Sequence, residues 1–106
     1  MIRQMRRFEI LLPTEFNDGR EVPRELLESA VKEVVDRFGA VSEEPEAVEG
    51  HWKTRGRVQQ DSLSKIVLDV DDTDENREWM RQYKSRWKDK LDQLEIWLVS
   101  YKIEVE

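Results

Sequence analysis

Hydrophobic and polar positions alternate along residues 6–12, with Phe8, Ile10 and Leu12 on one side of the alternation. A period of two is the repeat of a β-strand, because successive side chains point to opposite faces. Pro13 has no N–H to donate to a neighbouring strand, so we expect the strand to end there.

The spacing then becomes helical. Apolar residues recur at intervals of three and four over residues 23–38, which predicts an amphipathic helix after a turn at Asn17-Asp18-Gly19. Pro23 suits a first helical position, and Gly39 suits the C-terminal end, where a left-handed conformation is common. The apolar stripe of this helix consists of Leu26, Leu27, Ala30, Val31, Val34, Val35 and Phe38.

The middle of the chain predicts two strands joined by a hairpin turn. Strand character is found over residues 48–54 and again over residues 63–70, and Arg55-Gly56 predicts the turn. We expect a short return strand over residues 57–60 and a kink at Asp61-Ser62 before the second long strand.

A second helix and a last strand complete the pattern. An acidic turn leads into a helix that continues to about Leu91, with Thr73 or Asp74 as its N-cap. A strand is predicted over residues 94–105. The apolar stripe expected on the helix consists of Met80, Tyr83, Trp87 and Leu91, with Trp79 beside it.

The order of these elements is β-α-β-β-α-β, which is the split βαβ or ferredoxin-like plan. It predicts an α+β sandwich over residues 1–106 as a single domain, with two helices on one face of an antiparallel four-stranded sheet. Pro45 indicates that the second strand lies at an edge of that sheet. The plan supports many unrelated activities, so it does not give the function.

The last strand is apolar on both of its sides, because Trp97, Val99 and Tyr101 alternate with Ile96 and Leu98. A strand with one face in water alternates more cleanly than this. We therefore expect the helix-free face of the sheet to be covered in a homodimer, with Trp97, Val99 and Tyr101 at the interface. The alternatives are that a terminal segment covers this face, or that the aromatic residues are ordinary core.

Composition excludes several classes of function. The chain has 24 acidic and 18 basic side chains and a net charge of −6, which argues against a general nucleic-acid binder or an anionic-membrane binder. It has no cysteine, which excludes disulfides, thiolate metal sites and cysteine nucleophiles. No apolar run has the length of a membrane span and no secretory signal is recognisable, so we expect a cytoplasmic protein.

Several short motifs are spread along nearly the whole chain. They are Pro13-Thr14, Asn17-Asp18-Gly19, Arg37-Phe38-Gly39, Glu49-Gly50-His51-Trp52 and Glu95-Ile96-Trp97. Together they resemble a family of small, uncharacterised bacterial proteins that carries the status of a domain of unknown function. The resemblance supports the fold more than any activity.

Acidic residues at the end of the predicted third strand are a candidate metal site. Asp69 and Asp71 are two positions apart, so on a strand they point the same way, and Asp72 follows them. Paired carboxylates can hold magnesium or calcium. Helix capping and a solvated turn explain the same residues without an ion.

His51 is the one histidine and therefore the candidate general base. A histidine on an edge hairpin is more often an exposed or packing residue, and no serine or cysteine motif accompanies this one. Arg55 and Arg57 with Trp52 could form a local nucleic-acid or phosphate patch, although the acidic balance argues against this. The candidate ligand-binding residues as a set are Asn17, Asp18, Arg20, His51, Trp52 and Arg55.

The sequence thus favours a self-associating or protein-interaction domain over an enzyme, and it identifies no cofactor. The first alternative is a ligand-binding protein or enzyme with a pocket between residues 14–20 and residues 49–52. The second is a metal-dependent nuclease or nucleotide enzyme that uses Asp69 and Asp71.

Overall fold

The computed structural model describes the fold of residues 1–54 and 57–106, and the side chains of residues 1–44 and 62–106. Six elements follow in the order β-α-β-β-α-β that the hydrophobic pattern predicts. They are β1 (Arg3–Pro13), α1 (Arg24–Phe38), β2 (Ser42–Thr54), β3 (Arg57–Asp71), α2 (Asp74–Lys90) and β4 (Trp97–Val105).

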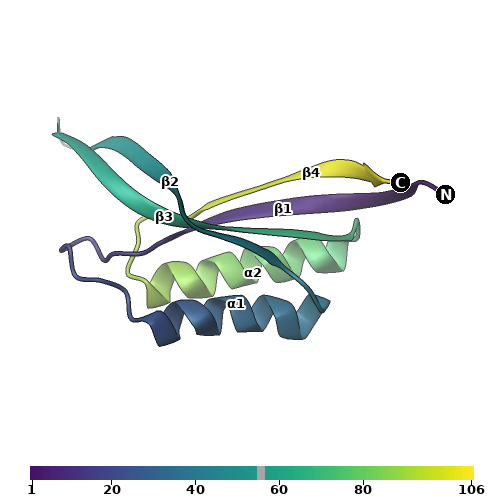
Figure 1. The fold of residues 1–106 in the computed structure, drawn as a ribbon, viewed down its shortest axis with the longest axis horizontal. Helices are drawn as coiled ribbons and strands as arrows, with labels where there is room; N and C mark the ends of the chain where they lie inside the picture. Colours follow the sequence, from purple (N-terminus) through teal and green to yellow (C-terminus); the bar gives the residue numbers. More distant parts are fainter. Residues whose placement is uncertain (55–56) are drawn as a thin grey trace.

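The four strands form one antiparallel sheet in the order β2-β3-β1-β4, and both helices lie on the same face of it (Figure 1). This is the predicted ferredoxin-like arrangement. The strand β2 lies at one edge of the sheet, as Pro45 indicates, and β4 lies at the other. The hairpin of β2 and β3 extends well beyond the helices (Figure 1).

The core lies between the sheet and the two helices. In β1, alternate residues point towards the helices, and the register places Ile10 opposite Ile66 and Phe8 opposite Leu68. Because the period of two is maintained across the strand pair, the two strands contribute one continuous apolar surface. The largest fully buried side chains are Trp87, Tyr83, Ile10, Leu12, Ile66, Met80, Leu91, Ile96 and Val34.

Both helices begin or end at the capping residues that the sequence predicts. Gly39 follows α1 with a φ of 89°, and its N–H donates to the carbonyl of Val35. Thr73 caps α2, where its hydroxyl accepts the N–H of Asn76 at 3.1 Å. These caps satisfy backbone groups that a helix end leaves without an intrahelical partner.

The strand limits differ from the predicted ones. The strand β1 begins at Arg3, because its first residues pair with the end of β4. The strand β2 begins at Ser42, and its register with β3 is irregular between Glu44 and Val48. The predicted kink at Asp61-Ser62 is wrong, since both residues pair in register with β2 and β3 is continuous. Strand pairing with a distant partner, which has no local signal, sets these limits.

Two apolar residues are not where the sequence predicts them, one in the last strand and one in the buried stripe of α1. Leu94 precedes β4 instead of belonging to it, because a turn with Asp92 at a φ of 51° separates α2 from the strand. Val35 on α1 is 37% exposed, whereas its neighbour Val34 is fully buried. The sheet does not cover the side of α1 on which Val35 lies, so part of the helical stripe stays at the surface.

Candidate functional site

In the part of the chain that the structure describes, no helix covers the face of the sheet opposite α1 and α2 (Figure 1). We call it the outer face. Alternation places Glu9 and Leu11 of β1 on it, where the register sets them opposite Val99 and Trp97 of β4. The described residues of its central part are Arg7, Glu9, Leu11, Lys65, Val67, Asp69, Trp97, Val99 and Tyr101.

The charged side chains of the outer face are paired with one another across three strands. Lys65 Nζ lies 2.6 Å from Glu9 Oε1, and the hydroxyl of Tyr101 donates to Glu9 Oε2 at 2.9 Å. Arg7 donates two hydrogen bonds to the carboxylate of Asp69, at 2.7 and 3.0 Å. The hydrogen bonds from Lys65 and Tyr101 hold the pKa of Glu9 below its ordinary value.

This contact predicts a stability change in acid. Folding lowers the pKa of Glu9 from its ordinary value of 4.5. As the pH falls below that value, the unfolded chain therefore binds a proton at Glu9 more readily than the folded chain does. The contribution of Glu9 to the free energy of unfolding, which is complete at higher pH, is then lost. In urea titrations, the free energy of unfolding should fall less steeply for Glu9→Gln than for the native chain between about pH 5 and pH 3. Glu25→Gln, which removes an exposed carboxylate of α1, is the control. Equal slopes in all three proteins would contradict the prediction.

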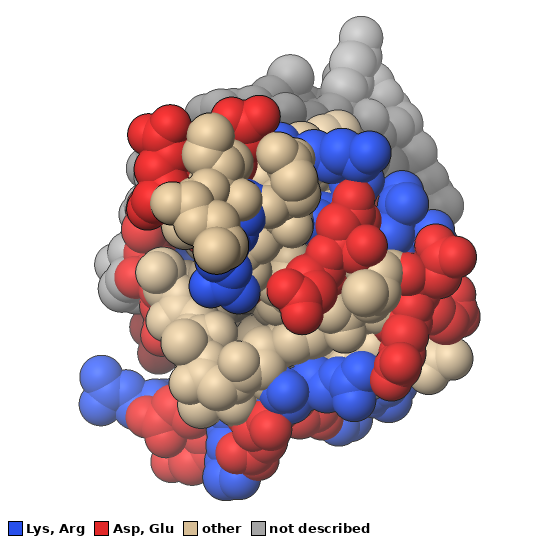
Figure 2. Space-filling model, turned by 90° about the vertical axis from the view of Figure 1, so that its right-hand side faces the viewer, with Lys and Arg blue, Asp and Glu red and all other residues tan. Residues whose placement is uncertain are grey.

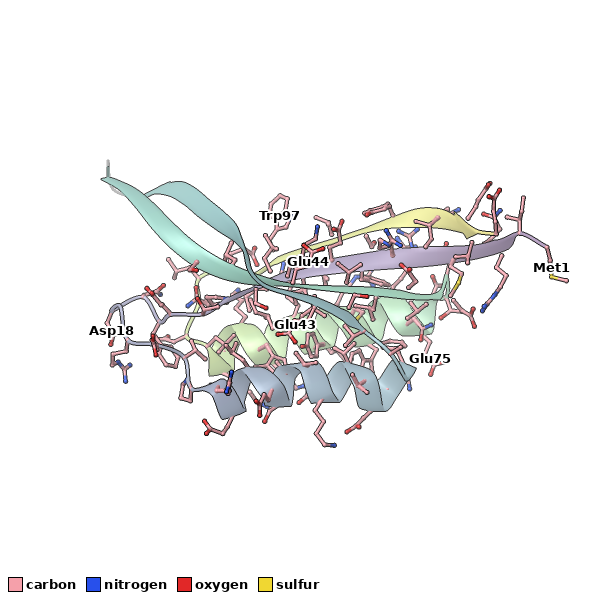
Figure 3. The ribbon with its side chains drawn as sticks, viewed as in Figure 1. Met1, Asp18, Glu43, Glu44, Glu75 and Trp97 are labelled. Carbon is pink, nitrogen blue, oxygen red and sulfur yellow. The ribbon has the colours of Figure 1, made fainter. Side chains whose placement is uncertain are left out.

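One end of the outer face is apolar and hollow. Trp97 is 63% exposed and Leu94 is 78% exposed. They border a hollow of about 320 Å³ together with Leu11, Pro13 and Leu63. Figure 3 shows Trp97 projecting from β4 on the side away from the helices. Large exposed apolar side chains gathered around a concave surface are typical of a binding surface.

The three predicted interface residues therefore share one face. Trp97 and Tyr101 are exposed, and Val99 lies half-buried between them on β4. The alternation of the last strand was sufficient to place them there. That a second copy covers them stays a prediction.

The loop residues Asn17, Asp18 and Arg20 make hydrogen bonds that hold the loop itself. Asp18 accepts the backbone N–H of Arg20 at 3.0 Å and its Nε at 2.6 Å, and these bonds lower the pKa of Asp18. The amide of Asn17 donates to the carbonyl of Asp92 at 3.0 Å. The guanidinium of Arg20 also lies 5.0 Å from the ring centre of Phe16.

The remaining candidate ligand-binding residues are His51, Trp52 and Arg55. Arg55 and the side chains of His51 and Trp52 lie outside the described part of the chain. The catalytic role considered for His51 therefore stays a prediction.

The three acidic candidates for a metal site have different neighbours. Asp69 binds Arg7 on the outer face, whereas Asp72 binds Arg6 at 2.8 Å on the side of the helices. Asp71 ends β3, and its carbonyl accepts the side-chain amide of Asn76. Among the described residues, no group of three or more histidine, aspartate or glutamate side chains is arranged to hold a metal ion.

Acidic and basic side chains are interspersed over the end of the molecule at which the chain termini lie, with a band of other residues between them (Figure 2). Charged side chains also pair between α1 and α2. The carboxylate of Glu33 accepts the indole N–H of Trp87 at 3.0 Å and a guanidinium N–H of Arg86 at 3.1 Å. Burial alone would raise the pKa of Glu33, but these donors outweigh it and the pKa is lowered.

Five of the six basic side chains of α2 fall into two sets by face. Arg86 and Lys90 lie over the rings of Trp79 and Trp87, at 5.8 and 4.5 Å from the ring centres. Arg77, Arg81 and Lys84 instead line a small groove beside β4. The sequence shows that the helix surface is basic, but it does not show which cations share a groove with the last strand.

Among the described residues, no helix has the length and apolar character needed to cross a membrane.

No family model and no curated protein matches the sequence. Solved structures do match. CutA1 from Oryza sativa has a TM-score of 0.66 at 10% identity, over 97% of this chain and 83% of its own. The divalent cation tolerance protein (CutA1) from Thermus thermophilus has a TM-score of 0.63 at 16% identity, over 93% and 84%. What they share with this chain is the fold. At identities this low, a shared fold does not show a shared activity.

Proposed function

We propose that this chain is a self-association domain that pairs with a second copy through the outer face of the sheet. The observation that carries the proposal is the exposed pair Trp97 and Leu94 beside the apolar hollow. Tryptophan is among the residues that contribute most to binding energy at protein interfaces. Burying one such large apolar side chain contributes about 2 kcal/mol.

The charges of the outer face support a second copy as the partner. Arg7 binds Asp69, and Lys65 binds Glu9, so these ions already have counter-ions within the same sheet. A partner that covers these ion pairs therefore leaves no charge without a counter-ion, and it need not supply a complementary charge pattern. Two copies related by a two-fold axis would each offer the same hollow and the same tryptophan to the other.

Native mass spectrometry and analytical ultracentrifugation test the proposal. The native chain should form a dimer, whereas Trp97→Ala and Tyr101→Glu should be monomeric with unchanged helix content, because each removes an apolar contact or inserts a charge. Tyr101→Phe keeps the ring and loses only the hydrogen bond to Glu9, so it should stay dimeric. Val35→Glu, on the helical side, should also stay dimeric.

Two outcomes would contradict this proposal. One is a native chain that stays monomeric up to millimolar concentration. The other is a Trp97→Ala variant that associates as tightly as the native chain, since the outer face would then not be the contact.

A ligand-binding role is the second candidate, supported by a cavity of about 840 Å³ beside α1. Thr14 and Glu15 line it from the loop over residues 14–20 that the sequence indicates, and Leu27 and Val31 of α1 form an apolar wall. A cavity of this size with mixed lining suits a small organic molecule. The same native mass spectra would report a retained small molecule as added mass, which would favour this candidate.

A further inference from the structure

The two edges of the sheet differ in how they are protected against pairing with another strand. Edge strands expose unpaired N–H and C=O groups, and proteins commonly protect them with proline or with irregular register. The edge strand β2 has both features, namely Pro45 and the register shift between Glu44 and Val48. The edge strand β4 has neither, since it contains no proline and pairs with β1 in unbroken register from Trp97 to Val105.

A basic groove runs beside this open edge. It has a volume of about 200 Å³ and lies between α2 and β4. Arg77, Arg81 and Lys84 line it from the helix, where positions i, i+4 and i+7 share one face. Ser100 and Leu98 line it from the strand. In a chain with a net charge of −6, the groove is a local concentration of positive charge.

These cations are available to a partner. Arg81 pairs with Glu78 at 3.2 Å, and both side chains are exposed; Lys84, which is half-buried, pairs with the exposed Glu95 at 2.9 Å. Exposed pairs of this kind contribute little to stability and exchange readily. Among the described side chains, no carboxylate lies within salt-bridge distance of Arg77. Arg86 and Lys90, by contrast, are engaged with Glu33 and the tryptophan rings.

We propose that the open edge of β4 and the basic groove together bind an extended acidic segment of another protein, which adds to the sheet as a fifth strand. Backbone hydrogen bonds to β4 would provide affinity and the groove would provide selectivity, as in other cases of strand addition. The groove faces α2 and not the outer face proposed for self-association, and the two sites adjoin at Val99.

The geometry specifies the pattern of the segment. Its side chains alternate, so one set lies over the groove and the other lies beside Val99 and Tyr101 at the border of the outer face. From Arg77 to Lys84 the helix rises about 10 Å, while acidic residues two positions apart on a strand are separated by about 7 Å. Two or three acidic residues that alternate with apolar or β-branched ones therefore match the groove.

The β4 strand of a second copy fits the same edge poorly. Pairing β4 with β4 of another copy would bring the two basic grooves together, and Lys102 would add to the repulsion from the same side of each strand. Charge complementarity therefore favours an acidic partner.

A labelled ten-residue peptide that alternates Glu with Val or Thr is the probe, titrated against the full chain by fluorescence anisotropy. A peptide of the same composition with its glutamates grouped at one end is the control ligand. The alternating peptide should bind more tightly, and its affinity should fall as salt rises. The variant Arg77→Glu with Arg81→Glu should weaken binding at least about tenfold. Arg24→Glu with Lys32→Glu makes the same change of charge on α1 and should change the affinity by less than about twofold.

Hydrogen exchange separates strand addition from simple charge attraction. Backbone amides of β4 should exchange more slowly in the complex, and those of β2 should not change. The proposal is overturned if the alternating peptide does not bind, if both peptides bind equally, or if binding leaves the amides of β4 unprotected. It is also overturned if the charge reversals change the oligomeric state and not the peptide affinity, since the occupant would then be a second copy.

Discussion

Replacing Trp87 by alanine is expected to lower the free energy of unfolding by about 3–5 kcal/mol. Trp87 is 1% exposed and packs against Tyr83 with ring centres 6.2 Å apart. The substitution leaves a large cavity in the core between α2 and the sheet. It also removes the indole N–H that binds Glu33 at 3.0 Å, so the partly buried carboxylate loses a donor.

Urea denaturation followed by circular dichroism measures this loss, at a protein concentration at which the chain is monomeric. Trp97→Ala is the matched control, because it removes the same side chain from a position that is 63% exposed. Its unfolding free energy should lie within about 1 kcal/mol of the native value. Equal losses for the two tryptophans would show that the core is not organised around Trp87.

Asp72→Ala is expected to lower the free energy of unfolding by more than the loss of an exposed surface ion pair does, because it leaves a buried guanidinium without its carboxylate. The side chain of Arg6 is only 9% exposed, and its Nε lies 2.8 Å from Asp72 Oδ1. Its Nη1 donates to the hydroxyl of Ser100 at 2.9 Å. The same ion pair lowers the pKa of Asp72.

Arg6→Met removes this ion pair from the other side and should destabilise the protein less than Asp72→Ala does. The methionine keeps an apolar chain against the core, and the carboxylate of Asp72, which is 23% exposed, regains water. Urea denaturation of the two variants gives the comparison. A larger loss for Arg6→Met would mean that packing of the arginine stem, and not the charge, decides the stability.

The features that the sequence predicted well are those with a local signal. The alternation of Phe8, Ile10 and Leu12 placed β1 and its buried side correctly, because a period of two needs no knowledge of the neighbouring strand. Gly39 and Thr73 identified a helix end and a helix start for the same reason. The outward position of the aromatic residues of the last strand also followed from alternation.

The features that the sequence did not predict depend on partners far along the chain. The burial of Arg6 requires Asp72 and Ser100, which lie 66 and 94 positions away. The irregular register of β2 and the unbroken length of β3 arise from their mutual pairing. The groove beside β4 was missed because a helical repeat shows which cations share a side of α2, but not which strand that side faces.

The pairing of β1 with β4 determines how the fold responds to pulling. The strands run antiparallel with Arg3 opposite Val105, so both chain ends lie at the same end of the sheet (Figure 1). A force applied between the ends acts across this ladder and breaks its hydrogen bonds one after another, starting from that pair. The protein is therefore mechanically weak in this direction. Tension between its two ends separates β4 from β1 one hydrogen bond at a time, whereas a shearing force would have to break all of these bonds at once.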